Sequence, residues 1–292
     1  MSPVPAQWWH ESTYGSGITQ ALDLTTRHEE RSAFQEIGVY DHPVYGSVLT
    51  LDGTVQISQA DDFIYHEMAA HVPLLGRAWQ DARVLIIGGG DGGMLREVLR
   101  HDFVREVVMV EIDRRVIDLS NEHIGLQGDY ADPRVTLIID DAVRYVADTA
   151  RSDKRFDVVL IDATDSTGPT KVLLTRPFYH DLHTLLSPGG AVIDSDILLV
   201  GNDGGRLSRD PCDFSIYDII RSGLFARVEG YGARVPLYPG GPFAFFLYSK
   251  DGHSFRTPVR SWHGRYYDPE LHAAAFALPT WWRNLIAVGP NA

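Results

Sequence analysis

The stretch that most constrains how this chain can fold is Val84–Gly93, with the sequence VLIIGGGDGG. Four apolar residues without a polar interruption are typical of a strand that is buried on both faces of a parallel sheet. The glycines that follow allow a sharp turn and a close approach between the backbone and a ligand. A helix predicted to begin at about Gly93 would direct its free N–H groups at that ligand. The stretch therefore predicts a nucleotide-binding turn.

Asp91 is the unusual residue of this turn, because it places a carboxylate where a phosphate binder would need neutral or positive groups. A pyrophosphate above the turn would be repelled by Asp91, whereas an ammonium group would be held. The sequence therefore favours a nucleoside cofactor that has no phosphates and carries a positive charge.

Strands and helices alternate from Arg83 onward, which is typical of a doubly wound, mostly parallel α/β sheet of the Rossmann-like, class I methyltransferase type. Two further strands and a helix follow, and the sequence does not determine the direction of those two strands. The predicted strands are Val84–Ile87, Val107–Ile112, Val135–Ile139, Asp157–Ile161, Ala191–Ile193, Ala226–Tyr231 and Phe243–Ser249, and the predicted helices are Gly93–His101, Arg114–Glu122, Ala142–Ala150, Arg176–Leu186 and Phe214–Ser222.

The residues before this alternation predict a small antiparallel β-region. Strand-like segments at Ser47–Leu51 and Thr54–Ile57 flank Asp52 and Gly53, a strong hairpin signal. A helix is expected at Phe63–Leu75. We therefore expect an N-terminal β-hairpin domain at residues 1–60 and a Rossmann-like catalytic domain at residues 61–292.

Composition excludes several classes of protein. The net charge of −13 over 292 residues argues against a nucleic-acid partner and favours small cationic ligands. The single cysteine, Cys212, excludes an internal disulfide and fits a reducing compartment. The N-terminus lacks the pattern of a signal peptide, and no apolar run is long enough to cross a membrane. We expect a soluble, cytoplasmic protein without a membrane partner.

Acidic residues follow the predicted strands, at the edge where ligands bind in a doubly wound sheet. Glu111 lies about 20 residues beyond the glycine turn, the usual position of an acid that binds a ribose diol. Asp140 and Asp141 follow the third strand, and Asp162 and Asp165 follow the fourth. A single aspartate in such a position is more often a helix cap or a solvated turn. Several on one edge, together with the acid of the glycine turn, favour a site.

Asp162 and Asp165 suggest a chemical step. An alkylammonium must lose a proton before its nitrogen can attack carbon, and a nearby carboxylate could accept that proton. The alternative for this pair is an Asx-turn that leads into Gly168 and Pro169.

The glycine turn followed by Leu95, Arg96 and Glu97 resembles the signature of the spermidine synthases, the polyamine aminopropyltransferases. The resemblance extends in order from Trp8 to about Pro279. The further matching segments are Leu51–Gly53 with Gln56, Tyr65–Met68, Val110–Asp113, Tyr238 with Pro239, and Tyr266 and Tyr267 with His272, Phe276, Leu278 and Pro279.

The resemblance implies that decarboxylated S-adenosylmethionine gives its aminopropyl group to a small cationic amine, by default putrescine, which yields spermidine and releases methylthioadenosine. It implies catalytic roles for Asp162 as the base, for Asp165 beside it and for Tyr65. Tyr65 and Tyr238 would line the amine channel, where Asp162 and Asp165 would also contact the substrate. The cofactor-binding residues that it implies are Gln35, His66, Gly88, Gly90, Asp91, Gly92, Glu111, Asp140 and Asp141.

Asp91 would hold the ammonium of the aminopropyl arm, Glu111 the ribose, and Asp141 with Asp140 the adenine. Direct displacement at a sulfonium needs no metal, and the sequence shows no metal-ligand cluster, since His66 and His71 are spaced i and i+5, which is poor for sharing one ion. The resemblance also suggests a homodimer or homotetramer.

The chain departs from the family at the end of the fifth strand, where Asp194, Ser195 and Asp196 stand in place of a common glutamine. The cofactor half of the site is therefore well matched and the acceptor half is altered. Two alternatives stay open: an enzyme of this fold that uses another sulfonium reaction in a specialised pathway, and a non-catalytic nucleoside- or polyamine-binding module.

Overall fold

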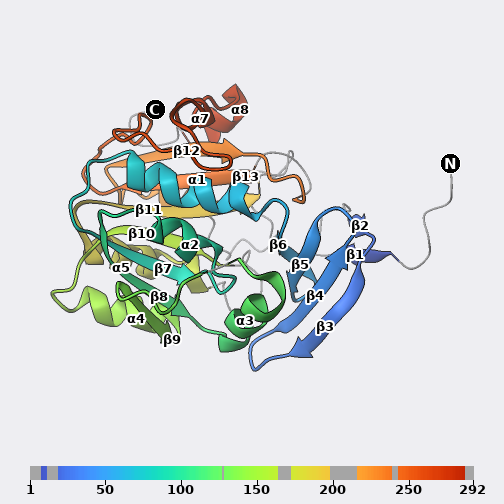
Figure 1. Ribbon diagram of the computed structural model, residues 1–292. Helices are drawn as coiled ribbons and strands as arrows, with labels where there is room; N and C mark the ends of the chain where they lie inside the picture. Colours follow the sequence, from blue (N-terminus) through green and yellow to red (C-terminus); the bar gives the residue numbers. More distant parts are fainter. Residues whose placement is uncertain are drawn as a thin grey trace.

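The structure is a computed structural model that describes residues 8–11, 19–126, 128–163, 172–197, 216–238 and 243–286. Figure 1 shows a large central sheet with helices on both faces and, beside it, a smaller antiparallel sheet formed by the N-terminal residues. The predicted fold class is confirmed by this arrangement. Among the described residues, no helix has the length and apolar content that a membrane crossing requires.

The central sheet has seven strands in the order β12-β13-β11-β10-β7-β8-β9. Its strands from β7 to β11 run parallel, whereas β13 pairs antiparallel with both β11 and β12. The strands are β7 (Ala82–Gly88), β8 (Val104–Glu111), β9 (Val135–Ile139), β10 (Phe156–Asp162), β11 (Leu186–Ile197), β12 (Arg227–Ala233) and β13 (Phe243–Ser249).

Strand β7 is buried on both faces, as its apolar run predicts. Val84 and Ile86 belong to one apolar core, and Leu85 and Ile87 belong to the core on the opposite face of the sheet. This alternation follows from the two-residue period of a strand. Burial on both faces makes β7 the rigid support of the glycine turn that follows it.

Helices α1 and α2 cover one face of the sheet, and α4 and α5 cover the other. The predicted helix at Arg114–Glu122 is two elements in the structure, because the chain widens into a π-helical turn that ends at the left-handed Gly125. The helical elements are α1 (Asp62–Leu75), α2 (Gly93–Leu99), α3 (Arg114–Leu119), η1 (Ser120–Ile124), α4 (Ala142–Ala150), α5 (Arg176–Leu185), α6 (Ile216–Arg221), α7 (Pro269–Ala275) and α8 (Thr280–Ile286).

The N-terminal residues form a four-stranded antiparallel sheet, in the order β3-β4-β5-β6, and a separate two-stranded ribbon. The hairpin predicted at Asp52 and Gly53 is confirmed, and both residues have positive φ angles, of 47° and 73°. The strands are β1 (Trp9–Glu11), β2 (Gln20–Leu22), β3 (Thr25–Arg31), β4 (Glu36–His42), β5 (Gly46–Leu51) and β6 (Thr54–Ser58).

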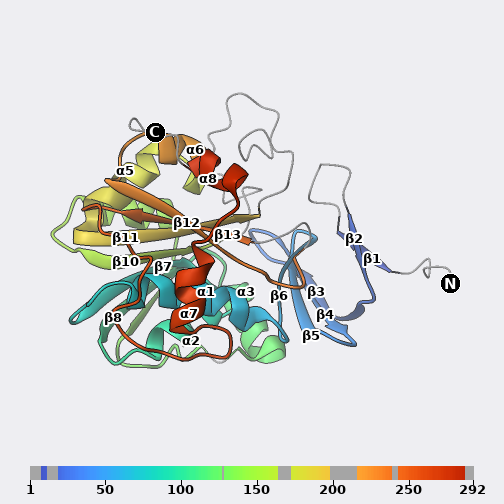
Figure 2. The same ribbon diagram turned by 90° about the horizontal axis from the view of Figure 1, so that it is seen from above.

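The N-terminal sheet packs against the α3–η1 corner of the central domain. Ile37, Leu49 and Ile57 from the sheet form one apolar cluster with Val116 of α3 and Ile124 of η1. Figure 2, viewed from above, shows these blue strands beside the edge of the larger sheet. The N-terminal sheet therefore forms a wall at the edge where the parallel strands end.

Candidate active site

The strand order changes direction between β10 and β7, and the site lies at this point. After β7 the chain proceeds outward through β8 and β9, and it then returns to place β10 on the other side of β7. Gly88 at the end of β7 is in register with Asp162 at the end of β10. In open α/β sheets the crevice at such a switch point is where ligands bind.

Gly88 is required by close packing against the neighbouring strand. Its φ is +81°, and a Cβ atom built there would lie 2.1 Å from the carbonyl oxygen of Asp162. The N–H of Gly89 donates a hydrogen bond of 2.8 Å to the same oxygen. The glycine turn is therefore fixed against the end of β10, which brings Asp91 and Asp162 to the same crevice.

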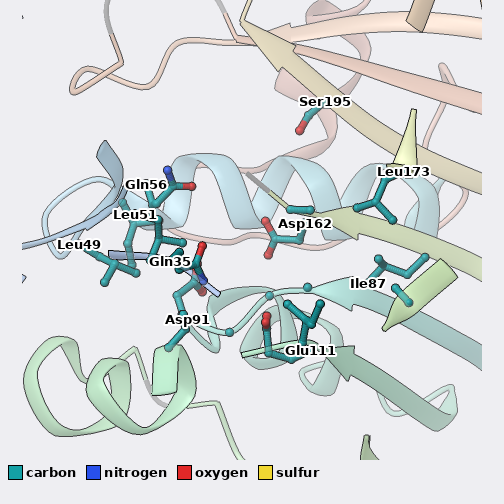
Figure 3. Close-up of a pocket in the computed structure, with 18 of the residues that line it drawn as sticks. Gln35, Leu49, Leu51, Gln56, Ile87, Asp91, Glu111, Asp162, Leu173 and Ser195 are labelled. Carbon is teal, nitrogen blue, oxygen red and sulfur yellow. The ribbon is translucent and has the colours of Figure 1, made fainter. Parts of the chain in front are cut away.

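A cleft at this edge is lined by residues from the glycine turn, the strand ends, the N-terminal sheet and α1. Figure 3 shows the side chains of Asp91, Glu111 and Asp162 around a common space, with Leu49 and Leu51 on one side and Leu173 on another. The predicted site residues that line the cleft are Gln35, Tyr65, Gly88, Gly90, Asp91, Glu111, Asp141, Asp162 and Tyr238.

The other predicted residues have different positions. His66 and Gly92 do not line the cleft. His66 lies next to it, because its ring forms an ion pair with Asp91, which does line the cleft. Asp140 does not line the cleft. Asp165 lies outside the described residues.

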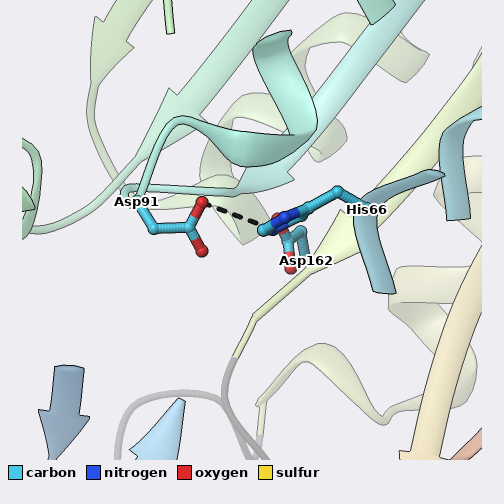
Figure 4. A group of neighbouring side chains, drawn as sticks. All are labelled: His66, Asp91 and Asp162. Atoms are coloured by element: carbon cyan, nitrogen blue, oxygen red, sulfur yellow. Dashed lines mark ion pairs between the residues drawn. The ribbon is translucent and has the colours of Figure 1, made fainter. Parts of the chain in front are cut away.

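His66, Asp91 and Asp162 converge behind the glycine turn, from α1, the turn and β10 (Figure 4). The ring Nε2 of His66 lies 3.4 Å from Oδ1 of Asp91, and one ligand atom from each of the three residues lies within 4.8 Å of the others. Gly93 makes room for the ring, because a Cβ there would lie 2.2 Å from Cε1 of His66. The spacing of these residues in the sequence did not reveal this group, because they are brought together by the fold.

The carboxyl group of Asp162 has an unusual pKa. Burial raises it, the neighbouring Asp91 carboxylate raises it further, and His66 opposes both effects, so that the pKa is about 7. Among the described residues, Oδ2 of Asp162 has no hydrogen-bond partner. A buried carboxyl group with a pKa near neutrality is suited to exchange a proton with a ligand.

His66 is held from behind by a carboxylate and an arginine. Its Nδ1 lies 3.2 Å from Oδ2 of Asp62, and Nη2 of Arg96 donates to the same oxygen at 2.8 Å. Burial lowers the pKa of His66, but the charge of Asp91 and the hydrogen bond of Asp62 outweigh burial and raise that pKa well above its usual value. Asp62 and Arg96 were not predicted as site residues, although the i, i+4 spacing of Asp62 and His66 is a signal for such a pair.

Glu111 ends β8 on the other side of the turn. Its Oε1 accepts a hydrogen bond of 2.8 Å from the N–H of Asp113, and burial raises its pKa to about 7. Gln35 of the N-terminal segment donates from Nε2 to Oδ2 of Asp113 at 3.1 Å and also lines the cleft. Asp113 therefore forms hydrogen bonds with both Gln35 and Glu111, which are far apart in the sequence.

Asp140 and Asp141 face different surroundings. Asp141 caps α4 by accepting a hydrogen bond of 2.8 Å from the N–H of Val143, and it lines the cleft. The Asp140 carboxylate instead pairs with Arg144 and accepts from the N–H of Asp141 at 2.7 Å. Only one of the two carboxylates is thus available to a ligand in the cleft.

Aromatic side chains form the end of the cleft next to β11 and β13. The Tyr65 hydroxyl lies 3.3 Å from Oγ of Ser195, and the Tyr238 hydroxyl donates to the backbone carbonyl of Gln56. The ring of Phe243 lies 5.3 Å, between centroids, from the rings of both tyrosines. This end can contact a methylene chain with ring faces and a polar group with hydroxyls.

Tyr130 is a residue near the site that sequence reasoning missed. Its buried hydroxyl has no hydrogen-bond partner in the part of the chain that the structure describes, and a Cβ at Gly92 would lie 3.0 Å from it. Burial raises the pKa of Tyr130, and the Asp91 and Glu111 carboxylates raise it further. Tyr130 belongs to no motif, so no sequence signal identified it.

Comparison with known proteins agrees with this geometry. The sequence profile of the spermine/spermidine synthase domain matches residues 62–257, and that of the spermidine synthase tetramerisation domain matches residues 8–59. The chain is 39% identical over 282 residues to polyamine aminopropyltransferase 1 of Pseudomonas aeruginosa, covering 92% of this chain and 94% of that one. It is 38% identical over 269 residues to the polyamine aminopropyltransferase of Pseudomonas syringae pv. tomato, covering 86% and 88%.

Two solved structures have the same fold. A spermidine synthase in complex with the transition state analogue AdoDATO superimposes with a TM-score of 0.84 at 29% identity, covering 98% of this chain and 97% of that one. The spermidine synthase of Thermotoga maritima superimposes with a TM-score of 0.78 at 27% identity, covering 98% and 96%. The chain is a transferase that belongs to the spermine/spermidine synthase family, the polyamine aminopropyltransferases.

Proposed function

We propose that this enzyme transfers the aminopropyl group of decarboxylated S-adenosylmethionine to a small di- or polyamine, with putrescine as the default acceptor, and releases methylthioadenosine. The observation that carries the proposal is the pair of carboxylates, Asp91 and Asp162, at the switch point of a sheet whose next strand ends in Glu111. This arrangement offers a nucleoside site beside a site for cations.

The cofactor would lie across the ends of β7 and β8. Glu111 would accept hydrogen bonds from the ribose hydroxyls, and Asp141 would accept one from the adenine amino group. Gln35 and His66 would lie along the nucleoside and its arm. Asp91 would hold the ammonium group of that arm through a charge-assisted hydrogen bond. We assign Asp140 only an indirect part, since its carboxylate orients the backbone of Asp141.

The reaction is a direct displacement. The acceptor's ammonium gives a proton to Asp162, whose pKa of about 7 suits this role. The free amine nitrogen then attacks the methylene carbon of the aminopropyl arm that is bound to the sulfonium sulfur. A C–N bond forms to this carbon while its C–S bond breaks. The bonding electron pair returns to sulfur, which becomes the neutral thioether of methylthioadenosine. Tyr65 would hold the acceptor beside the base, and Asp165 would assist there.

The same carboxylates would select the decarboxylated cofactor. S-adenosylmethionine carries a carboxylate on the arm that faces Asp91 and Asp162. Two like charges at about 4 Å repel by about 4 kcal/mol at an effective dielectric constant of about 20. The ordinary form should therefore bind far more weakly than the decarboxylated form.

The acceptor would enter along the aromatic end of the cleft. The faces of Tyr65, Tyr238 and Phe243 suit a methylene chain, and Ser195 offers a small hydroxyl at the end of β11. We propose putrescine first among small amines because the charge of the cleft favours a cation at each end of a short chain.

We also propose that the enzyme assembles as a homodimer or homotetramer through its N-terminal residues. The match of residues 8–59 to a tetramerisation domain supports this proposal, as does the position of β3 at an edge of its sheet. Light scattering of the purified chain should give a mass of two or four chains, and a monomer would contradict it.

A single assay tests the reaction. The protein is incubated with decarboxylated or ordinary S-adenosylmethionine and a panel of amines, and methylthioadenosine and the alkylated amine are quantified by mass spectrometry. We expect both products with the decarboxylated cofactor and a diamine, and only trace amounts with ordinary S-adenosylmethionine. Absence of methylthioadenosine with every amine would refute the proposal, and a cyclised or alkylated product would indicate another sulfonium reaction.

A further inference from the structure

The three side chains His66, Asp91 and Asp162 form a group that suits a metal ion as well as an ammonium ion. We propose that they bind one divalent transition-metal cation of the zinc class, and that this cation and the cationic arm of the cofactor exclude each other. The second statement rests on the proposed function, whereas metal binding itself does not.

The spacing of the ligand atoms agrees with a tetrahedral site. Zinc binds imidazole nitrogen and carboxylate oxygen at about 2.0–2.2 Å, which places two ligand atoms of a tetrahedron about 3.4 Å apart. Nε2 of His66 and Oδ1 of Asp91 are 3.4 Å apart. The third ligand atom, from Asp162, is within 4.8 Å of both.

Two of the three groups have ligand atoms without hydrogen-bond partners. Nε2 of His66 and Oδ2 of Asp162 are buried and make no hydrogen bond to any described residue. His66 has no exposed surface. Leaving such atoms unsatisfied is unfavourable, and a ligand at this position would recover the lost interactions.

The other ring nitrogen of His66 is held as it is in many zinc sites. Nδ1 lies 3.2 Å from Oδ2 of Asp62, which accepts a second hydrogen bond, of 2.8 Å, from Arg96. A carboxylate behind a histidine orients the ring and makes the free nitrogen a better metal ligand. Asp62 thus fixes the direction in which Nε2 points, toward Asp91.

The ligand set indicates the class of metal. One imidazole and two carboxylates suit Zn²⁺, Co²⁺ or Ni²⁺, whereas Mg²⁺ prefers oxygen ligands alone and retains its water. We therefore expect binding of Zn²⁺ at a concentration where Mg²⁺ does not bind. The remaining coordination position would face the cleft, where the arm of the cofactor would otherwise lie.

The first experiment measures metal binding without any substrate. Zn²⁺ is titrated into the protein by calorimetry, and Co²⁺ is titrated while its visible absorption is recorded. We expect one ion per chain with the strong absorption of tetrahedral Co²⁺, and at least a tenfold loss of affinity in both H66Q and D91N. Two variants are used because one of them could fail to fold, which thermal melting checks.

The matched control is H28Q. His28 on β3 also lies beside a carboxylate, with Nε2 at 2.9 Å from Oε2 of Glu30, but no third described residue completes a group of metal ligands there. Zn²⁺ binding should be unchanged in this variant. Binding that is absent from the wild-type protein, or equal in wild type, H66Q and D91N, would overturn the proposal.

The second experiment tests exclusion. Decarboxylated S-adenosylmethionine should weaken Zn²⁺ binding at least tenfold, whereas methylthioadenosine, which lacks the ammonium arm, should change it less than threefold. Equal effects of the two nucleosides would overturn the exclusion while leaving the metal site intact. An enzyme that is active in the assay above but binds no Zn²⁺ would refute the metal site alone and leave the proposed function standing.

Discussion

Helix α1 carries two buried histidines, five residues apart, that have opposite surroundings. His66 faces the cleft, and His71 faces a closed cluster with His101, Glu97 and Trp262. Both rings have no exposed surface, and each presents Nε2 to a carboxylate, at 3.4 Å for His66 and 3.3 Å for His71. Residue types and distances alone do not distinguish the two.

Charge compensation distinguishes them. In the closed cluster, Glu97 pairs with Arg96 at 2.7 Å and with Arg100 at 3.0 Å. At the cleft, Arg96 also pairs with Asp62, whereas Oδ2 of Asp162 has no hydrogen-bond partner among the described residues. The cleft is thus short of positive charge and the closed cluster is not.

A structural polar cluster differs from a functional one in how its buried charges are paired. Burying a charge is costly unless it is paired, so a compensated group such as Glu97 stabilises the fold and needs no ligand. An uncompensated group such as Asp162 lowers stability, and in the proposed function a cationic ligand would complete it. Changes at the cleft should therefore alter activity, and changes in the closed cluster should alter stability.

The largest effect is expected for Asp162→Asn. Loss of the proposed base should lower kcat by about 10³-fold, within the usual range for general-base catalysis. The melting temperature should stay the same or rise, since a buried uncompensated carboxyl group is removed. Methylthioadenosine formation and thermal unfolding check the two parts. Asp140→Asn is the matched control, because that carboxylate pairs with Arg144 outside the cleft. Equal losses of activity in both variants would contradict the role of Asp162.

The next effect concerns choice of cofactor. Asp91→Asn removes one of two carboxylates that repel the carboxylate of S-adenosylmethionine, and the asparagine oxygen can still accept the hydrogen bond that Asp91 receives from the N–H of Gly93 at 2.6 Å. We expect the kcat/KM for the decarboxylated cofactor, divided by that for the ordinary cofactor, to fall by about 10²-fold. This is part of the effect expected from the repulsion between two carboxylates about 4 Å apart. Competition assays with both cofactors measure the ratio. An unchanged ratio would show that selection does not depend on Asp91.

Much of the fold could be predicted from the sequence because its signals are local. The apolar run of β7, the glycine turn and the hairpin at Asp52 and Gly53 all result from short-range sterics and periodicity. Strand β3 was missed because its sequence, TTRHEER, is polar and partly exposed at a sheet edge. Helices α7 and α8 were missed because each has only seven residues and both follow the last strand, outside the alternation of strands and helices.

The candidate site was predictable in part for a similar reason. Carboxylates at strand ends share one edge of the sheet by topology, so Glu111, Asp141 and Asp162 were found from their positions. Which of Asp140 and Asp141 faces the cleft depends on the turn into α4 and on Arg144, which a sequence does not show. The convergence of His66 with residues of two other elements depends on tertiary packing, so spacing could not reveal it.

A smaller effect, on stability alone, is expected for Glu97→Gln. The amide cannot match the carboxylate that pairs with Arg96 and Arg100, and we expect a loss of about 3 kcal/mol in the free energy of unfolding. The activity per folded molecule should change far less than in Asp162→Asn. Urea unfolding measures the loss. The surface control is Glu106→Gln, since the partly exposed Glu106 carboxylate pairs with Lys154 at 2.7 Å, and a loss below about 1 kcal/mol is expected there. Similar losses at both glutamates would contradict the assignment of Glu97 to a stabilising cluster.

The smallest effect is a change in the pH dependence of stability, and His101 should cause it. Burial lowers the pKa of His101, with a further contribution from His71, from 6.5 to about 3. Between these values the unfolded chain binds more protons than the folded one, so stability falls as pH decreases, by at most about 1.4 kcal/mol per pH unit for one group. His101→Gln should flatten the slope of the unfolding free energy between pH 6.5 and 5, measured by urea unfolding. Glu97→Gln should keep that slope. Burial raises the pKa of Glu97, but His71 and Arg96 lower it from 4.5 to about 2. The contribution of Glu97 to stability is therefore lost only below pH 4.5, outside the range from pH 6.5 to 5. If the slope is the same in wild type and His101→Gln, the closed cluster does not hold His101 neutral, and the contrast with the cleft would rest on the arginine pairs of Glu97 alone.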